Sequence, residues 1–259
     1  MKKDPRVIVD ASGKHVMDFF VPCYMTDGNC RLKASAFMTQ AQEMAMNSAE
    51  ILGFGYDELF PNYGMAWVLS RFHFKFLRPV MWREFVRIRT WHKGVRSVFY
   101  VRDFELLGED GELSMIGTSS WVVLNLKERS LVRMNELPPV ISPEPMLEED
   151  AIEALAPKVM IPRKVQAEFV HNHIVSYSDI DLNKHTNNVR YIDWALDCID
   201  AEVTDNCPVK EVSINFNRET HLGETVSLYR HEEQAGEDHI FIIEGKVEDT
   251  QSFCARIVF

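Results

Sequence analysis

The most polar stretch of the sequence, SYSDIDLNKHTNNVRYIDW, lies at residues 176–194. Within it, Asp181, Asn183 and His185 occupy alternate positions just before an apolar pattern that predicts a helix. A histidine titrates near neutral pH and can activate a water molecule. The first N–H groups of a helix have no partner within the helix and suit a developing oxyanion. The segment therefore predicts acid–base chemistry beside a helix N-terminus.

Two internal matches predict that the chain contains two copies of one unit. Residues 76–88, FLRPVMWREFVRI, match residues 216–228, FNRETHLGETVSL, at an offset of 140. Upstream, residues 24–29, YMTDGN, match residues 178–183, SDIDLN, at an offset of 154. Because the two matches occur in the same order, chance is a poor explanation for both.

The two copies differ where the chemistry would take place. Arg31 stands at the position of His185, and Pro79 stands at the position of Glu219. The second unit therefore has both acid–base residues and the first unit has neither, as expected for one working site and one degenerate site. The alternative is that the polar segment only forms a turn and a helix cap, with His185 exposed to solvent.

Each unit is predicted to contain one strand, one helix and then four strands. Apolar residues recur at helical spacing before Gly53 in the first unit, and after a cap at Asn187 or Asn188 in the second. The residues at helical spacing are Phe37, Ala41, Met44, Ala45, Ser48 and Leu52 in the first unit, and Val189, Ile192, Leu196 and Ile199 in the second. The turns GEDG and EQAGED are expected between the last two strands of each unit. A long antiparallel sheet wrapped around one helix, present twice, predicts an α+β fold of two tandem hot-dog units.

The units are assigned to residues 1–135 and 158–259, the second being catalytic. Residues 136–157 are rich in proline and acidic side chains and are expected to form an extended, solvated linker. A short helical turn is expected near Glu148–Leu155.

Composition excludes several classes of protein. The 259 residues carry a net charge of −11, which argues against a general nucleic-acid binder. No uncharged stretch approaches the roughly 20 residues of a membrane span, and the N-terminus lacks the apolar run of a signal peptide. The five cysteines form no CxxC pair, which fits reduced thiols in a cytoplasmic protein.

The segment DLNKHTNNVRYIDW, followed by Glu219 within NRE, resembles the fatty acyl–acyl carrier protein thioesterase family, which has tandem hot-dog folds in plant plastids and in bacteria. The likeness continues in the first half through AFMTQAQEMAMNSAE, AWVLSRFHFKFLRPVMWREFVRIRTW and GTSSWVVLN. It implies hydrolysis of fatty-acyl thioesters on acyl carrier protein, without a cofactor. It also implies a catalytic network of Asp181, Asn183, His185 and Glu219. The absence of a transit peptide favours a bacterial member, although a trimmed chain would look the same.

One position departs from the family pattern. Plant members commonly have cysteine directly after the glutamate, whereas this chain has Thr220. Because a threonine hydroxyl is a weak nucleophile without a dedicated base, we expect direct attack by water. His185 and Glu219 would share its deprotonation, with the general base left open between them. Asn183 would position the water or the carbonyl, and Asp181 would orient its neighbours.

Two weaker signals each have two interpretations. Phe37, Met38 and Met44 fit a packed core, or alternatively the lining of an acyl tunnel. His171 and His173 alternate on a strand without a third ligand nearby, so surface positions are favoured and no metal is predicted.

Nine cations lie between residues 71 and 102, against Glu84 alone. They fit the solvated face of a strand pair, or a docking surface for an acidic carrier protein through Arg83, Arg87 and Arg96. The alternative functions are an acyl-CoA thioesterase, a hydroxyacyl dehydratase and a non-catalytic acyl-binding module. The sequence leaves open the acyl chain length, branching and oligomeric state, including a homodimer.

Overall fold

The computed structural model describes residues 4–141, 144 and 146–259. The elements of the first unit are β1 (Ile8–Val9), β2 (His15–Phe20), η1 (Cys23–Met25), α1 (Ala34–Leu52), α2 (Tyr56–Tyr63), β3 (Met65–Phe76), β4 (Phe85–Arg96), β5 (Phe99–Gly108), β6 (Leu113–Asn125), β7 (Ser130–Leu131) and η2 (Met134–Glu136). Those of the second unit are β8 (Glu168–Ile174), η3 (Tyr177–Asp179), α3 (Asn188–Asp197), α4 (Ala201–Asn206), β9 (Glu211–Phe216), β10 (Thr225–Ala235), β11 (Asp238–Val247) and β12 (Thr250–Val258).

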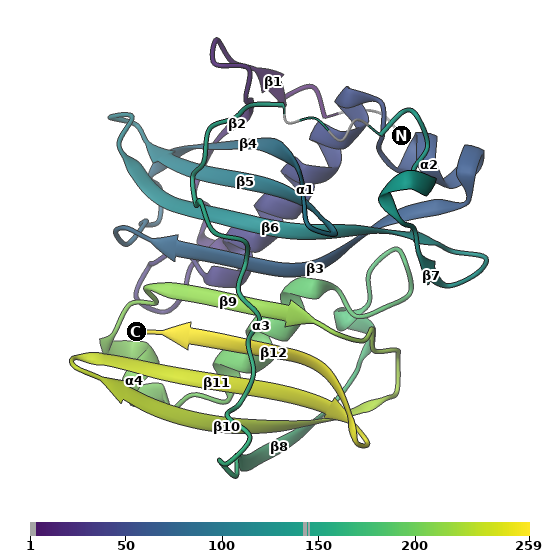
Figure 1. The fold of residues 1–259 in the computed structure, drawn as a ribbon. Coiled ribbons are helices and arrows are strands. Elements are labelled where there is room, and N and C mark those ends of the chain that lie inside the picture. The colour runs from purple at the N-terminus through teal and green to yellow at the C-terminus, as the bar shows by residue number, and fades with distance from the viewer. Residues whose placement is uncertain (1–3, 142–143, 145) are drawn as a thin grey trace.

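The strands form one antiparallel sheet in the order β1-β2-β4-β5-β6-β3-β9-β12-β11-β10-β8, with β7 paired to β6. Strands β3 and β9 join the two units, with Phe72 opposite Ile214. Figure 1 shows α1 and α3 on one face of this sheet, each behind the strands of its own unit. The predicted architecture of two tandem hot-dog units is therefore confirmed.

The helices form where the apolar spacing predicted them. In α1, the side chains of Phe37, Ala41 and Met44 are buried, and Gly53 ends the helix with φ of +84°. In the second unit, the Asn187 side chain caps α3 by accepting a hydrogen bond from the Val189 amide at 3.2 Å. Helices α2 and α4 were not predicted.

The repeat is visible in the hydrogen bonds as well as in the sequence. Arg78 pairs with Glu84 in the turn between β3 and β4, and Arg218 pairs with Glu224 in the turn between β9 and β10. These pairs hold equivalent turns at the predicted offset of 140. One expected turn was misplaced: EQAGED joins β10 to β11, whereas a turn at Glu248 with φ of +54° precedes β12.

The segment between the units crosses the face of the sheet opposite the helices (Figure 1). The segment is only partly solvated, because Trp91 Nε1 donates to Glu149 O at 2.8 Å and the Ala151 amide donates to Asp103 Oδ2 at 2.7 Å. The expected helical turn near Glu148–Leu155 is replaced by bends. Residues 142, 143 and 145 of this segment lie outside the described residues. The proposed limits of the two units stay a prediction.

The helices that the structure describes also bear on membrane insertion. None of them is both long enough and apolar enough to cross a membrane.

Candidate functional site

A tight turn between η3 and α3 presents the polar segment. The Asp181 amide donates to His185 O at 2.9 Å, and the Lys184 amide donates to Asp181 O at 3.0 Å. The Asp181 carboxylate accepts a hydrogen bond from the Asn183 amide at 2.8 Å, and Lys184 adopts φ of +63°. Asp181 therefore holds the turn that carries Asn183 and His185, and its role in catalysis stays a prediction.

The structure brings His185 and Glu219 into contact. His185 Nδ1 lies 3.1 Å from Glu219 Oε2, and the two side chains are 36% and 37% exposed. The contact joins a turn before α3 to the residues that follow β9, 34 positions later in the chain. Both side chains are therefore partly open to solvent.

Two residues at this site were not found from the sequence. Arg129 Nη2 donates to Glu219 Oε1 at 2.9 Å, and His221 Nε2 lies 3.9 Å from the same oxygen. The rings of His185 and His221 meet edge to face, with centroids 4.9 Å apart. His221 stands two residues after Glu219 and could have been noticed. Arg129 belongs to the first unit, and nothing in its local sequence predicts a contact 90 residues away.

His185, Glu219 and His221 form a cluster of groups that can bind metal ions. His185, Glu219 and His221 have ligand atoms that all lie within 4.8 Å of one another, and these are ligand types that zinc accepts. The guanidinium of Arg129, however, already places a positive charge beside Glu219. We therefore assign no metal to the cluster. The dismissed candidate His173 bonds to Asp179 Oδ2 at 3.0 Å, which fits a structural role.

Beneath the exposed pair lies a buried layer of hydroxyl groups. Thr220 Oγ1 lies 2.6 Å from Thr186 Oγ1 and 2.9 Å from the hydroxyl of Tyr191. Thr220 is fully buried, and burial also raises the pKa of Tyr191. These contacts assign Thr220 a structural position away from the open site, which argues against its use as a nucleophile.

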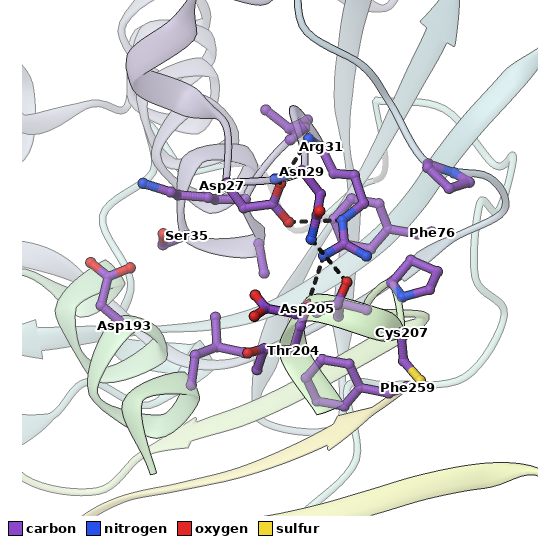
Figure 2. A pocket seen from close by; sticks show the side chains of 18 of the residues that line it. Asp27, Asn29, Arg31, Ser35, Phe76, Asp193, Thr204, Asp205, Cys207 and Phe259 are labelled. Carbon is purple, nitrogen blue, oxygen red and sulfur yellow. Dashed lines mark hydrogen bonds and ion pairs between the residues drawn. The ribbon is translucent and has the colours of Figure 1, made fainter. Parts of the chain in front are cut away.

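The first unit contains the same turn with different contacts. The Asp27 amide donates to Arg31 O at 2.8 Å, as the Asp181 amide does to His185 O. Arg31 Nη2 then donates to Thr204 O at 2.7 Å. Asn29 donates to Asp205 O at 2.9 Å (Figure 2). Both acceptors lie in α4, so the first turn binds the second unit.

A cavity of about 480 Å³ lies beside this first turn and is lined by both units (Figure 2). His185 and Glu219 do not line it. Among its charged residues, Asp27 pairs with Arg31 and Asp193 pairs with Arg190. The cavity is therefore separate from the contact between His185 and Glu219.

The proposed tunnel residues belong to the main apolar core. Phe37, Met38 and Met44 are at most 1% exposed, and the Phe37 ring lies 5.1 Å from that of Phe74. None of the three lines the cavity beside the first turn. Their packing fits the core interpretation, and the tunnel stays a prediction.

The proposed docking arginines do not form one compact surface. Arg87 makes two hydrogen bonds to Asp18, at 2.6 and 2.7 Å, and Arg96 donates to Asp150 at 3.0 Å. Arg87 and Arg96 lie at opposite ends of β4, about 30 Å apart at the rise of an extended strand. Arg83 stacks its guanidinium 4.1 Å from the Trp82 ring. Arg87 and Arg96 are therefore already neutralised by acidic partners.

Comparison with known proteins matches both halves of the chain to domains of one family. Residues 12–137 match the family described as acyl-ACP thioesterase N-terminal domain, and residues 163–255 match the acyl-ACP thioesterase C-terminal domain. The chain is 28% identical over 216 residues to oleoyl-acyl carrier protein thioesterase 2, chloroplastic, of Arabidopsis thaliana, a match that covers 78% of this chain and 58% of the relative. It thus spans about three-fifths of the length of such curated relatives.

Two solved structures share the fold. An acyl-ACP thioesterase from Bacteroides thetaiotaomicron superposes with a TM-score of 0.83 at 21% identity, over 94% of this chain and 96% of that one. The 12:0-ACP thioesterase from Umbellularia californica superposes with a TM-score of 0.78 at 19% identity, over 94% and 92%. With both family regions matched in order along most of its length, the chain belongs to the acyl-ACP thioesterase family.

Proposed function

We propose that the protein releases free fatty acids by hydrolysing acyl thioesters carried on acyl carrier protein. The observation that carries this proposal is the 3.1 Å contact between His185 Nδ1 and Glu219 Oε2, in the unit of the family fold that retains both groups. The names of the relatives support the substrate class. A non-catalytic acyl-binding module would have no need for this acid–base pair.

In the proposed mechanism, His185 is the general base and Glu219 orients it. Glu219 Oε2 lies 3.1 Å from Nδ1, which leaves Nε2 on the far side of the imidazole ring for a water molecule. His185 removes a proton from the water as its oxygen attacks the thioester carbonyl carbon. The tetrahedral intermediate then collapses, the C–S bond breaks, and His185 returns the proton to the departing thiolate.

Two neighbours would support the reaction. The exposed side chain of Asn183 is the proposed donor to the carbonyl oxygen or the attacking water, on the turn that Asp181 holds. The helix N-terminus is a weaker oxyanion donor than expected, because the Asn187 side chain already accepts a hydrogen bond from the Val189 amide.

The same proposal includes the protein partner, the cellular compartment and the acyl-binding residues. The carrier protein is acidic, and Arg83, Arg87 and Arg96 are retained as candidate contacts. All five cysteines are free, which supports a reducing compartment such as the cytoplasm. Phe37, Met38 and Met44 are retained as the candidate lining of the acyl tunnel.

The test is an assay of the purified protein on a panel of acyl carrier protein thioesters, with the freed acids identified by mass spectrometry. Each acid is also supplied as its coenzyme A thioester. Hydrolysis of the carrier-bound panel supports the proposal. Faster hydrolysis of the coenzyme A panel, hydration of an enoyl substrate, or binding without turnover would each replace it with one of the alternatives. A shift toward shorter acids in Met44→Trp would support the tunnel, and an unchanged profile would remove it.

A further inference from the structure

We infer that Arg129, supplied by the first unit, is a positioning residue that holds Glu219 in its working orientation. Its Nη2 donates to Glu219 Oε1 at 2.9 Å, while Glu219 Oε2 faces His185 Nδ1 at 3.1 Å. The two oxygens of the carboxylate are thus assigned to two different partners. This inference rests on the proposed function.

The contact is built by a defined turn. The side-chain oxygen of Asn125 accepts hydrogen bonds from the Lys127 amide at 3.0 Å and the Glu128 amide at 3.1 Å. Arg129 then adopts φ of +51°, and β7 begins at the next residue, with Ser130 opposite Asn125. The backbone at Arg129 is therefore fixed on both sides, and its side chain extends to the second unit.

The ion pair between Arg129 and Glu219 fixes the orientation of the carboxylate and adds little to the stability of the protein. Arg129 is 81% exposed, and exposed ion pairs contribute little to the free energy of unfolding. A carboxylate with one fixed oxygen, however, has fewer ways to turn its other oxygen away from His185. Because small errors in the placement of a catalytic group reduce the rate, loss of this contact should lower kcat.

The first unit has a second role at the site. Its own turn has lost the histidine and glutamate, and Arg31 there binds α4 through Thr204 O. Through Arg129, the same unit also contacts the glutamate of the working site. The site is therefore shared between the units, and the first unit is a required part of it.

The experiment compares Arg129→Gln, Arg129→Lys and the matched control Lys127→Gln, an exposed cation in the same turn. Hydrolysis of a carrier-bound substrate and of a small thioester is measured, with folding checked by circular dichroism. We expect Arg129→Gln to lower kcat about 10- to 100-fold on both substrates with little change in KM. Arg129→Lys should recover part of the loss, and Lys127→Gln should match the wild type.

A double-mutant cycle separates positioning from a general effect. In the Glu219→Gln background, Arg129→Gln should cause no further loss. Crystal structures should show the Glu219 carboxylate turned away from His185 in Arg129→Gln and unmoved in Lys127→Gln. An undiminished kcat in Arg129→Gln, an equal loss in the Glu219→Gln background, or an equal loss in Lys127→Gln would overturn the inference alone. A wild-type protein without thioesterase activity would instead defeat the proposed function.

Discussion

The hydroxyl groups of Thr186 and Thr220 lie 2.6 Å apart in the buried layer beneath the site. Thr186 directly follows His185, and Thr220 directly follows Glu219. The Thr186 amide also donates to Thr220 O at 2.9 Å. Two segments that are distant in sequence are therefore tied together immediately behind the two proposed acid–base groups. In the first unit, the matching positions are the apolar Leu32 and Val80.

Thr220→Val should destabilise the protein while leaving the chemistry in place. The substitution removes the hydroxyl partner of Thr186 and Tyr191, and a buried polar group left without a partner costs about 1–3 kcal/mol. Urea unfolding measures the loss, with Thr220→Ser as the control that keeps the hydroxyl. We expect kcat of the folded variant to stay within a few-fold of wild type. An acyl adduct on Thr220 in quenched reactions would show that it acts as a nucleophile.

Substitutions in the turn of the first unit should lower stability, whereas substitutions in the turn of the second unit should lower activity. Arg31→Ala removes hydrogen bonds to Asp27 and to Thr204 O, and charged hydrogen bonds of this kind contribute about 1.5–3 kcal/mol. We expect a lower unfolding midpoint with unchanged kcat. Asn183→Ala, the counterpart of Asn29→Ala, should lower kcat with little change in stability. Loss of activity in a fully folded Arg31→Ala protein would contradict the division between a working and a structural turn.

Much of the fold was predictable because its signals are local. The helix cap at Asn187, the stop at Gly53 and the alternation along the strands all depend on near neighbours in the chain. The pairing of His185 with Glu219 was predictable for a different reason: the second copy has both residues, the first has neither, and the family resemblance implies one catalytic network that contains both. Comparison of the copies, together with the family resemblance, thus replaced the missing three-dimensional information.

The parts that were missed depend on distant contacts. Arg129 reaches Glu219 only after β6 and β9 are placed in one sheet on either side of β3. The linker looked solvated because its composition is rich in proline and acidic residues, yet Lys93 and Asp103 on the sheet provide partners for it. Composition records the polarity of a segment and says nothing of the surface that it meets.

Stability should fall in mild acid because of two buried histidines in the first unit. Burial first, and Arg102 next, lower the pKa of His15 and of His92 to about 4, from an unfolded value near 6.5. Both are held neutral in the folded protein, so their contribution is fully present above pH 6.5 and is lost as the pH falls toward 4. The loss is at most about 3 kcal/mol for each histidine.

This acid sensitivity is measured by urea unfolding across the same pH window. His15→Gln and His92→Gln should each flatten the decline. If stability falls with pH as steeply in both variants as in the wild type, other groups cause the acid sensitivity.

Reversing the proposed docking arginines should separate carrier recognition from chemistry. Arg83→Glu should raise KM for the carrier-bound substrate several-fold, without altering hydrolysis of a small thioester. Arg87→Glu and Arg96→Glu should have smaller specific effects, because Asp18 and Asp150 already neutralise these residues. The measurement is steady-state kinetics on both substrates at two salt concentrations. Equal kinetics for all three variants and the wild type would remove this surface from the proposal.

In the proposed mechanism, His185, with Glu219 beside it, activates the water that cleaves the thioester. Its most direct test is single-turnover hydrolysis of an acyl carrier protein thioester by His185→Ala and by Glu219→Gln, with folding confirmed by circular dichroism. We expect His185→Ala to lower the rate about 10²- to 10⁴-fold. Glu219→Gln should also be strongly impaired, because the amide no longer supplies the carboxylate that orients the ring. Near-full turnover by both folded variants would contradict the account.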